Sequence, residues 1–246
     1  MKDNNKNREF TKINAKIQDR VQEIVEEIKN IDNGLALAEV KKERIELTDL
    51  LKKHVRTAMT GGNIGFGKTN AAETIAIYGR AQEVYENDKN PLLVKYYQDK
   101  KKYSRDLQIN LIDGRLYEYI INTLKYPTDP IIFDRTHYED PDVFCYALNK
   151  INCLADEDKD YLVNYYFDMK KEELEQRYKI DFTPDLIILI KGDLNLGWKR
   201  VQGRNRTMEV QVEKEFKELY QALQEEYESF PERLKKRYNG PLVILP

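Results

Sequence analysis

Apolar residues recur at helical spacing through the first fifty residues of the chain. Over residues 13–31 they stand three or four positions apart and form one stripe, which consists of Ile13, Ile17, Val21, Ile24, Ile28 and Ile31. Asp32-Asn33-Gly34 is a turn signal, and a less regular apolar pattern follows from Leu37 to Leu51. Two amphipathic helices are therefore expected, either as a hairpin packed on the rest of the protein or as a dimerisation element.

The pattern changes after residue 53, where short apolar runs alternate with longer helical segments. Strands are predicted at about 54–60, 81–86, 131–133, 185–190 and 241–246, with helical patterns between them. This alternation predicts an α/β fold, with a five-stranded, parallel sheet flanked by helices. The expected domains are a helical extension over 1–53 and an α/β domain over 54–246. The first strand is more polar than a buried parallel strand usually is.

Composition adds a heavily charged, soluble surface to this picture. Charged residues make up 34% of the chain and hydrophobic residues 41%, and no apolar run reaches the about 18 residues that a membrane span needs. The polar start of the chain does not match a secretory signal. A net charge of −2 gives no reason to expect nucleic-acid binding. We therefore expect a cytoplasmic protein with two reduced cysteines.

The segment that follows the first strand has the form of a phosphate-binding loop. Residues 62–69 read Gly-Asn-Ile-Gly-Phe-Gly-Lys-Thr, and a helical pattern comes next. Glycines allow successive backbone N–H groups to converge on phosphate oxygens, and the positive end of the following helix points at the same oxygens. Lys68 then reaches the β- and γ-phosphates, and the Thr69 hydroxyl is placed to bind Mg²⁺. The loop predicts a nucleotide site.

Polar side chains also follow the next two predicted strands directly. Glu86 follows the second strand, and Asp134-Arg135 follows the third. Ligands of parallel sheets bind beyond the carboxyl ends of the strands, so these residues are expected near the phosphate loop. Phosphoryl transfer needs a bridging metal and a base near the acceptor hydroxyl. Asp134 could hold that metal together with Thr69, although it could also be the N-cap of a helix.

A basic segment near the carboxyl end of the chain is the second candidate for phosphate binding. Residues 199–206 read Lys-Arg-Val-Gln-Gly-Arg-Asn-Arg, in which Arg200 and Arg204 share one helical face. Such a segment is a solvated basic face in many proteins. Beside a phosphate loop we interpret it as a lid, at about 199–209, that closes over the phosphates.

Together these motifs resemble the deoxynucleoside kinase family, specifically its bacterial deoxyadenosine, deoxyguanosine and deoxycytidine kinase branch. The resemblance covers about 54–246, with the fold of a P-loop kinase. It rests on motifs in family order, which are Gly62–Thr69, Tyr85-Glu86, Asn90-Pro91-Leu92-Leu93, Tyr97, Gln108, Arg115, Asp134-Arg135-Thr136-His137-Tyr138-Glu139-Asp140, Asp185–Asp193 and Arg200–Glu209.

The resemblance implies a role for each side of the site. ATP and its phosphates would be bound by Gly62, Asn63, Ile64, Gly65, Phe66, Gly67, Lys68, Thr69, Arg200, Arg204 and Arg206, and Mg²⁺ by Thr69 and Asp134. Glu86 matches the general base that takes the proton of the 5′-hydroxyl. Glu83 is the alternative, because the following segment is one residue shorter than in relatives. Arg135 matches the arginine that bridges the acceptor and the phosphates.

The resemblance also assigns the residues that bind the nucleoside. Gln108 would read the edge of the base, and Tyr97 and Glu209 would hold the 3′-hydroxyl. Arg115 and Asp140 match a pair found in the deoxycytidine and purine kinases, which disfavours thymidine as the substrate. The sequence ends at Pro246, and in relatives the loop after the last strand helps to hold the donor adenine. Recognition of the donor base therefore stays open.

The implied activity is ATP- and Mg²⁺-dependent phosphorylation of the 5′-hydroxyl of a purine deoxynucleoside, with deoxyadenosine favoured and deoxycytidine second. Two alternatives stay open. One is a deoxynucleoside monophosphate kinase, which would need additional cations for the acceptor phosphate. The other is a non-catalytic family member that acts as a structural subunit. The family commonly dimerises through helices, so the resemblance implies a homodimer, with a small molecule as its substrate and no membrane or nucleic-acid partner.

Overall fold

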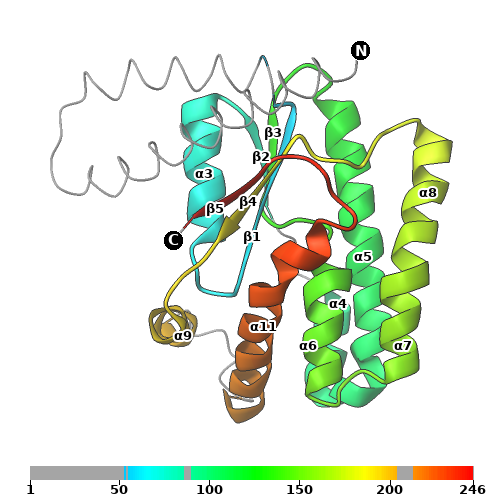
Figure 1. The fold of residues 1–246 in the computed structure, drawn as a ribbon, viewed down its shortest axis with the longest axis vertical. Coiled ribbons are helices and arrows are strands. Elements are labelled where there is room, and N and C mark those ends of the chain that lie inside the picture. Colours follow the sequence, from blue (N-terminus) through cyan, green and yellow to red (C-terminus); the bar gives the residue numbers. More distant parts are fainter. Residues whose placement is uncertain (1–52, 54, 86–89, 204–212, 246) are drawn as a thin grey trace, which may run out of the picture.

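The computed structural model describes residues 53, 55–85, 90–203 and 213–245 (Figure 1). The expected extension over 1–53 lies outside this range except for Lys53, so its two helices stay a prediction. Glu86, Arg204, Arg206 and Glu209 also lie outside it. Within the described part of the chain, no helix is long and apolar enough to span a bilayer.

A five-stranded parallel sheet forms the centre of the fold. Its strands are β1 (Thr57–Gly62), β2 (Gln82–Val84), β3 (Ile131–Phe133), β4 (Leu186–Ile190) and β5 (Leu242–Leu245), in the order β2-β3-β1-β4-β5. All four pairings are parallel. The prediction of a five-stranded, parallel sheet flanked by helices is confirmed. The carboxyl ends of β1, β2 and β3 meet at one edge of this sheet, which brings the segments that follow them together.

The polar first strand is nevertheless fully buried at the centre of the sheet. Its polar groups are satisfied locally, as buried polar groups must be. The Asp185 carboxylate, just before β4, accepts hydrogen bonds from the backbone N–H groups of Arg56 and Thr57, at 2.8 and 2.9 Å. The Thr60 hydroxyl donates to the carbonyl of Phe133 in β3 at 3.4 Å. Threonine is therefore accommodated here without loss of pairing.

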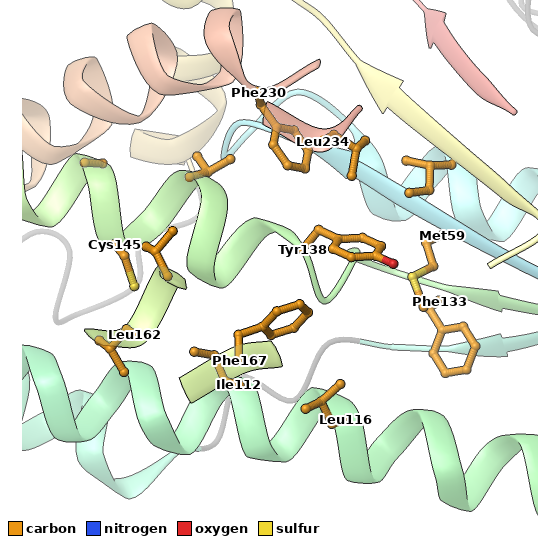
Figure 2. Packing of buried hydrophobic residues seen from close by; sticks show 14 of the residues in the cluster. Met59, Ile112, Leu116, Phe133, Tyr138, Cys145, Leu162, Phe167, Phe230 and Leu234 are labelled. Atoms are coloured by element: carbon orange, nitrogen blue, oxygen red, sulfur yellow. The ribbon is translucent and has the colours of Figure 1, made fainter. Parts of the chain in front are cut away.

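Alternating side chains divide the sheet into two apolar faces. One face packs on α3 (Lys68–Gly79), whose main strand contacts are with β1, β2 and β3. Leu186, Ile188 and Val243, from β4 and β5, point to this same face and are at most 1% exposed. The opposite face carries the larger cluster of buried residues, shown in Figure 2, to which β1, β3 and the helices beyond them contribute.

The helices of that second layer follow the predicted segments with two breaks. The expected helix over 92–125 is split into α4 (Pro91–Gln98) and α5 (Lys100–Lys125), because Asp99 is extended and caps α5 by accepting the N–H of Lys102. The expected helix over 141–178 is broken near Asn152, which has a φ of 56°. Its parts are π-helix η1 (Asp140–Phe144), α6 (Cys145–Lys150), α7 (Asp156–Tyr161), π-helix η2 (Leu162–Tyr166) and α8 (Phe167–Tyr178).

Two helices complete the described chain. Helix α9 (Leu194–Gly203) follows β4, and α11 (Glu213–Leu234) leads back to β5. In Figure 1, α3 lies on one side of the sheet, whereas α5, α6, α8 and α11 lie on the other. The space between these layers at the carboxyl edge of the sheet is where the predicted site residues gather.

An imidazole without hydrogen bonds lies within the second layer. His137 is 2% exposed, neither ring nitrogen has a hydrogen-bond partner among the described residues, and the ring lies among Tyr119, Phe167 and Phe182. Burial lowers the pKa of His137 from 6.5 to about 3, and the charges of Lys171 and Arg115 act in the same direction. The folded protein therefore holds this imidazole neutral.

His137→Leu is expected to remove a pH-dependent loss of stability. Below pH 6.5 the unfolded chain protonates this histidine and the folded chain does not, so stability falls between pH 6.5 and about 3. Each pKa unit corresponds to about 1.4 kcal/mol, which gives a loss of roughly 5 kcal/mol over the whole window. Denaturant unfolding at pH 7, 5 and 4 should show the variant gaining stability over the wild type as the pH falls. An equal difference at all three pH values would contradict this account.

Candidate active site

The glycine loop between β1 and α3 has the geometry of a phosphate cradle. Gly62 has a φ of 138°, and a Cβ there would collide with the carbonyl of Ile190. Gly67 has a φ of 88° and precedes the first turn of α3. The Asn63 side chain, fully buried, accepts the N–H of Ile64 at 2.8 Å and donates to Gln224 of α11 at 3.2 Å. The loop is thus fixed by its own backbone and by α11.

Lys68 and Thr69 begin α3 directly under this loop. The ammonium group of Lys68 donates to the carbonyl of Asn63 at 3.2 Å, and the residue is 7% exposed. The Thr69 hydroxyl donates to Oδ2 of Asp134 at 2.6 Å, and the Thr60 hydroxyl donates to the other oxygen at 3.4 Å. A lysine and a hydroxyl–carboxylate pair therefore stand together at the amino end of a helix, where anions are favoured.

The donor atoms of Thr69 and Asp134 fit a magnesium ion. Mg²⁺ prefers oxygen ligands, keeps several waters, and binds proteins through one or two carboxylates together with substrate phosphates. The hydroxyl and carboxylate oxygens are adjacent, and both residues line the same cavity. When held by Thr69 and Asp134, the ion would supply positive charge that offsets the charge of the phosphates.

A cavity of about 550 Å³ extends from this loop into the second layer of helices. Its volume suits a small-molecule ligand. Twelve of the predicted site residues line it, namely Ile64, Gly65, Gly67, Lys68, Thr69, Tyr97, Gln108, Arg115, Asp134, Arg135, Asp140 and Arg200. Gly62, Asn63 and Phe66 belong to the loop but do not line this cavity. The apolar walls, among them Tyr96, Leu107 and Phe144, were not singled out from the sequence, because they repeat the pattern of ordinary core positions.

The far end of the cavity carries a small polar group on an apolar wall. The Arg115 guanidinium donates to the Asp140 carboxylate, whose side chain is 1% exposed. Gln108, which precedes Arg115 by about two turns of α5, is also 1% exposed. Its carbonyl oxygen is 3.9 Å from the Cys145 thiol. An amide and a carboxylate–guanidinium pair offer both donors and acceptors, as recognition of a heterocyclic base requires.

Arg135 links the two ends of the cavity. It has a φ of 114°, which is uncommon for a residue with a side chain and marks local backbone strain. Its Nη1 donates to the hydroxyl of Tyr227 in α11 at 3.2 Å and lies 3.7 Å from Oε2 of Glu139. Its guanidinium stacks over the Phe144 ring at 4.9 Å. Glu139 belongs to the Asp134–Asp140 motif, in which the resemblance assigns it no role, and its side chain is fully buried.

Of the two candidate bases, only Glu83 lies among the described residues. It is part of β2, does not line the cavity, and has one buried carboxylate oxygen with no hydrogen-bond partner in the described part of the chain. Burial raises the pKa of Glu83, and the charges of Glu73 and Asp134 raise it further, against a lowering hydrogen bond from Tyr85. Tyr85, by contrast, lines the cavity. Glu86 lies outside the described residues.

The basic segment reaches the loop through one of its arginines. Arg200 of α9 donates from Nη1 to the carbonyl of Gly65 at 3.3 Å. It also borders a second cavity of about 410 Å³, which shares Gly67, Asn70 and Arg200 with the first and extends along α3 towards Leu245. Phe66 lines this second cavity. Arg204, Arg206 and Glu209 lie outside the described part of the chain, so their predicted roles stay predictions.

Comparison with known proteins gives a consistent result. The family model described as "Deoxynucleoside kinase" matches residues 59–245. A deoxyadenosine kinase of Lactobacillus acidophilus is 28% identical over 193 residues, which cover 78% of this chain and 85% of that protein. A deoxyadenosine/deoxycytidine kinase of Bacillus subtilis is 30% identical over 156 residues, covering 63% and 68%. A deoxyadenosine kinase structure from M. mycoides with bound dCTP has a TM-score of 0.63 at 23% identity, covering 77% and 89%.

Proposed function

This chain belongs to the deoxynucleoside kinase family and is a phosphotransferase, and we propose that it transfers the γ-phosphoryl group of ATP to the 5′-hydroxyl of a purine deoxynucleoside. Deoxyadenosine is the favoured acceptor and deoxycytidine the second. The observation that carries the proposal is the single cavity in which a phosphate loop at one end faces the Gln108, Arg115 and Asp140 group at the other. Such a cavity suits a donor phosphate and a nucleoside base at opposite ends.

The phosphate end supplies positioning and positive charge. Backbone N–H groups of the loop and the Lys68 ammonium bind the phosphates of ATP, while Thr69 and Asp134 hold Mg²⁺. Arg200 and Arg135 both line the cavity. The transferred group then lies between fixed cations, which stabilise the charge that spreads over its oxygens in the transition state.

The chemical step needs one base at the acceptor hydroxyl. In our proposal the Glu86 carboxylate takes the proton of the 5′-hydroxyl, whose oxygen forms the new bond to the γ-phosphorus. The bond from that phosphorus to the bridging oxygen breaks, and the electron pair leaves with ADP. The backbone N–H of Asp134 donates to the Val84 carbonyl at 2.9 Å. The chain after Val84 therefore emerges beside Asp134 and Arg135.

The described residues support a nucleoside better than a nucleotide acceptor. A deoxynucleoside monophosphate kinase would need additional cations near the phosphate loop to bind the acceptor phosphate. Arg135, which lines the cavity, lies 3.7 Å from the Glu139 carboxylate, which offsets part of its charge. The purine preference rests on the names of the relatives, which are a deoxyadenosine kinase, a deoxyadenosine/deoxycytidine kinase and a deoxyguanosine kinase.

A phosphorylation assay over the four deoxynucleosides with ATP and Mg²⁺ tests the proposal. Deoxyadenosine should give the highest kcat/KM and thymidine the lowest. Deoxyadenosine monophosphate is the control acceptor, and it should not be phosphorylated. Turnover of the monophosphate without turnover of any nucleoside would replace the proposal with the monophosphate kinase alternative.

Cys145 and Cys153 are free thiols, which suits a reducing compartment, and we infer that the enzyme acts in the cytoplasm.

We also propose that two copies associate through the outer face of α5 and α8. Four apolar side chains are exposed on α5 and on the η2–α8 segment, by 60%, 58%, 57% and 38% for Ile121, Leu124, Tyr165 and Met169. The two segments are neighbours, because the Tyr166 hydroxyl donates to Asp113 at 2.9 Å. Apolar patches on a soluble protein mark association sites, and the family resemblance favours a second copy as the partner.

Replacing both Ile121 and Leu124 with lysine is expected to convert a dimer into a monomer. Two charges in an apolar interface remain unpaired on association, and each costs several kcal/mol. Light scattering coupled to size exclusion gives the mass. Ile77→Lys is the matched control, because Ile77 is an equally exposed isoleucine, at 60%, on α3 across the sheet. A wild-type monomer, or a double variant that stays dimeric, would contradict this interface.

We further propose that residues 1–53 form an extension that covers the β4–β5 half of the sheet. On this face α3 contacts mainly β1, β2 and β3, and α9 and α11 add Val201, Phe216 and Tyr220 to the same buried cluster. Leu186, Ile188 and Val243 are nevertheless at most 1% exposed. A helix about 10 Å wide covers two strands that lie about 4.8 Å apart. The amphipathic segment 37–51 precedes β1 directly, as a helix in an αβ unit does.

Deletion of residues 1–53 is expected to leave a protein that binds hydrophobic dye and unfolds at a much lower temperature. Exposing three aliphatic side chains costs about 1.5–3 kcal/mol each, which is comparable with the whole stability of a domain. Deletion of residues 1–12, which leaves both predicted helices, is the control and should change neither property. A 54–246 protein with unchanged melting temperature would show that the extension does not cover this face.

A further inference from the structure

The Glu139 carboxylate lies between the phosphate loop and the acceptor side of the cavity. It is fully buried, five residues after Asp134. Its Oε1 accepts the backbone N–H of Gly62, the first residue of the loop, at 2.9 Å, and also the hydroxyl of Tyr227. Its Oε2 accepts the N–H of Thr136 at 3.2 Å and lies 3.7 Å from Nη1 of Arg135. One side chain thus contacts both the phosphate loop and Arg135.

Burying this group is costly. Desolvation raises the pKa of Glu139, while Arg135, Lys68 and hydrogen bonds from Tyr227 and Gly62 lower it. An apolar side chain of similar volume is often at least as good for stability as a buried ion pair. Stability alone therefore gives little reason for a carboxylate at this position. Every partner named here belongs to the loop, to the Arg135 turn or to the tyrosine that joins them.

The two backbone segments that Glu139 holds are both in unusual conformations. Gly62 has a φ of 138° and Arg135 a φ of 114°. Such conformations persist only where surrounding contacts determine them, and they cluster at functional sites. Room is made for the carboxylate by Gly61, where a Cβ would lie 3.3 Å from Oε1. Glu139 therefore joins the strained Arg135 turn to the glycine turn that begins the phosphate loop, which follows a different strand.

We propose that Glu139 is a positioning residue, which fixes the phosphate loop and Arg135 relative to each other for transfer between donor and acceptor. The inference rests on the proposed phosphoryl transfer, because that reaction requires the loop and Arg135 to act on the same phosphoryl group. A displacement of about 1 Å in such a group can cost about 10²-fold in rate. Glu139 itself touches neither ligand, since it does not line the cavity.

Glu139→Gln tests the inference, and a second variant that also loses a buried carboxylate charge serves as its control. The control is Asp142→Asn, because Asp142 is also buried, at 2%, forms an ion pair with Arg237 at 3.3 Å, and does not line the cavity. Both changes leave an arginine without its buried carboxylate and should lower the melting temperature. Only Glu139→Gln is expected to lower kcat, by at least about tenfold, and to weaken ATP binding several-fold in an equilibrium titration. Both are measured well below the melting temperatures.

Tyr227→Phe keeps the test informative if Glu139→Gln does not fold. It removes only the hydroxyl that joins Arg135 and Glu139, and it should lower kcat by a smaller factor. The inference would be overturned if Glu139→Gln, or Tyr227→Phe in its place, had the same kcat and ATP affinity as Asp142→Asn. A wild type that binds ATP but phosphorylates no deoxynucleoside would refute the proposed function instead. The ATP titrations would then still decide whether Glu139 positions the loop.

Discussion

Glu86→Gln is expected to lower kcat for deoxynucleoside phosphorylation by roughly 10²–10⁴-fold, the contribution of a positioned general base. Glutamine keeps the size of the side chain but cannot take up the proton of the 5′-hydroxyl. Deoxynucleoside binding should therefore persist and be measurable by equilibrium titration. Val84 pairs with Phe133, and Tyr85, the residue before Glu86 in the sequence, lines the cavity.

Glu83→Gln is the matched control, and we expect it to change kcat by less than about threefold, since a group outside the site contributes little to a rate. Glu83 lies within β2, does not line the cavity, and has neighbours of like charge in Glu73 and Asp134. The raised pKa of Glu83 follows from burial first. If Glu83→Gln were inactive and Glu86→Gln active, the assignment of the base would be wrong by three positions.

Lys68→Met is expected to lower kcat by roughly 10²–10³-fold, as the loss of one preorganised donor to a transition-state charge does. The ammonium group is already held against the Asn63 carbonyl and is nearly buried, so it does not need to be ordered when ATP binds. Methionine has a similar length and no charge. The loss should appear in kcat for every acceptor alike, because Lys68 lies at the phosphate end.

Lys101→Met provides the comparison for Lys68→Met. It removes the same charge from an exposed position on α5 that does not line the cavity. Exposed charges contribute little, so kcat should stay within about twofold of the wild type. Steady-state rates at saturating ATP and acceptor measure both variants. Equal losses in the two would mean that only the overall charge of the protein matters.

The strands were the part of the fold that sequence patterns predicted best. Residues 131–133 and 186–190 are continuous apolar runs, and continuous runs of this kind are typical of parallel strands buried on both faces. The first strand looked too polar, because its threonines are satisfied by Asp185 and by β3, which lie far along the chain. Breaks at Asp99 and Asn152 depend on single backbone conformations and left no change in apolar spacing.

Individual site residues were predictable to the extent that a motif carries them. Most of the loop, Asp134-Arg135 and the Arg115–Asp140 pair line one cavity, although their roles stay predictions. Glu139 was visible within a motif but not interpretable, since its partner Tyr227 lies 88 positions away and its contact with Gly62 spans 77. Contacts of that kind follow from how helices and strands pack and have no local pattern.

The order of the strands has a consequence for how the protein is made. β1 lies between β3 and β4, and the contact of Thr57 with Asp185 joins residues 128 positions apart. At about 5–20 residues per second, a ribosome needs roughly 6–25 s to make the chain between them. During that time β1 has an unpaired edge, and unpaired apolar edges promote aggregation. The two threonines of β1 make this unpaired strand less prone to aggregation than an aliphatic strand would be. The polarity that made β1 look unlike a central strand therefore suits a strand that is synthesised first and pairs with β4 only late.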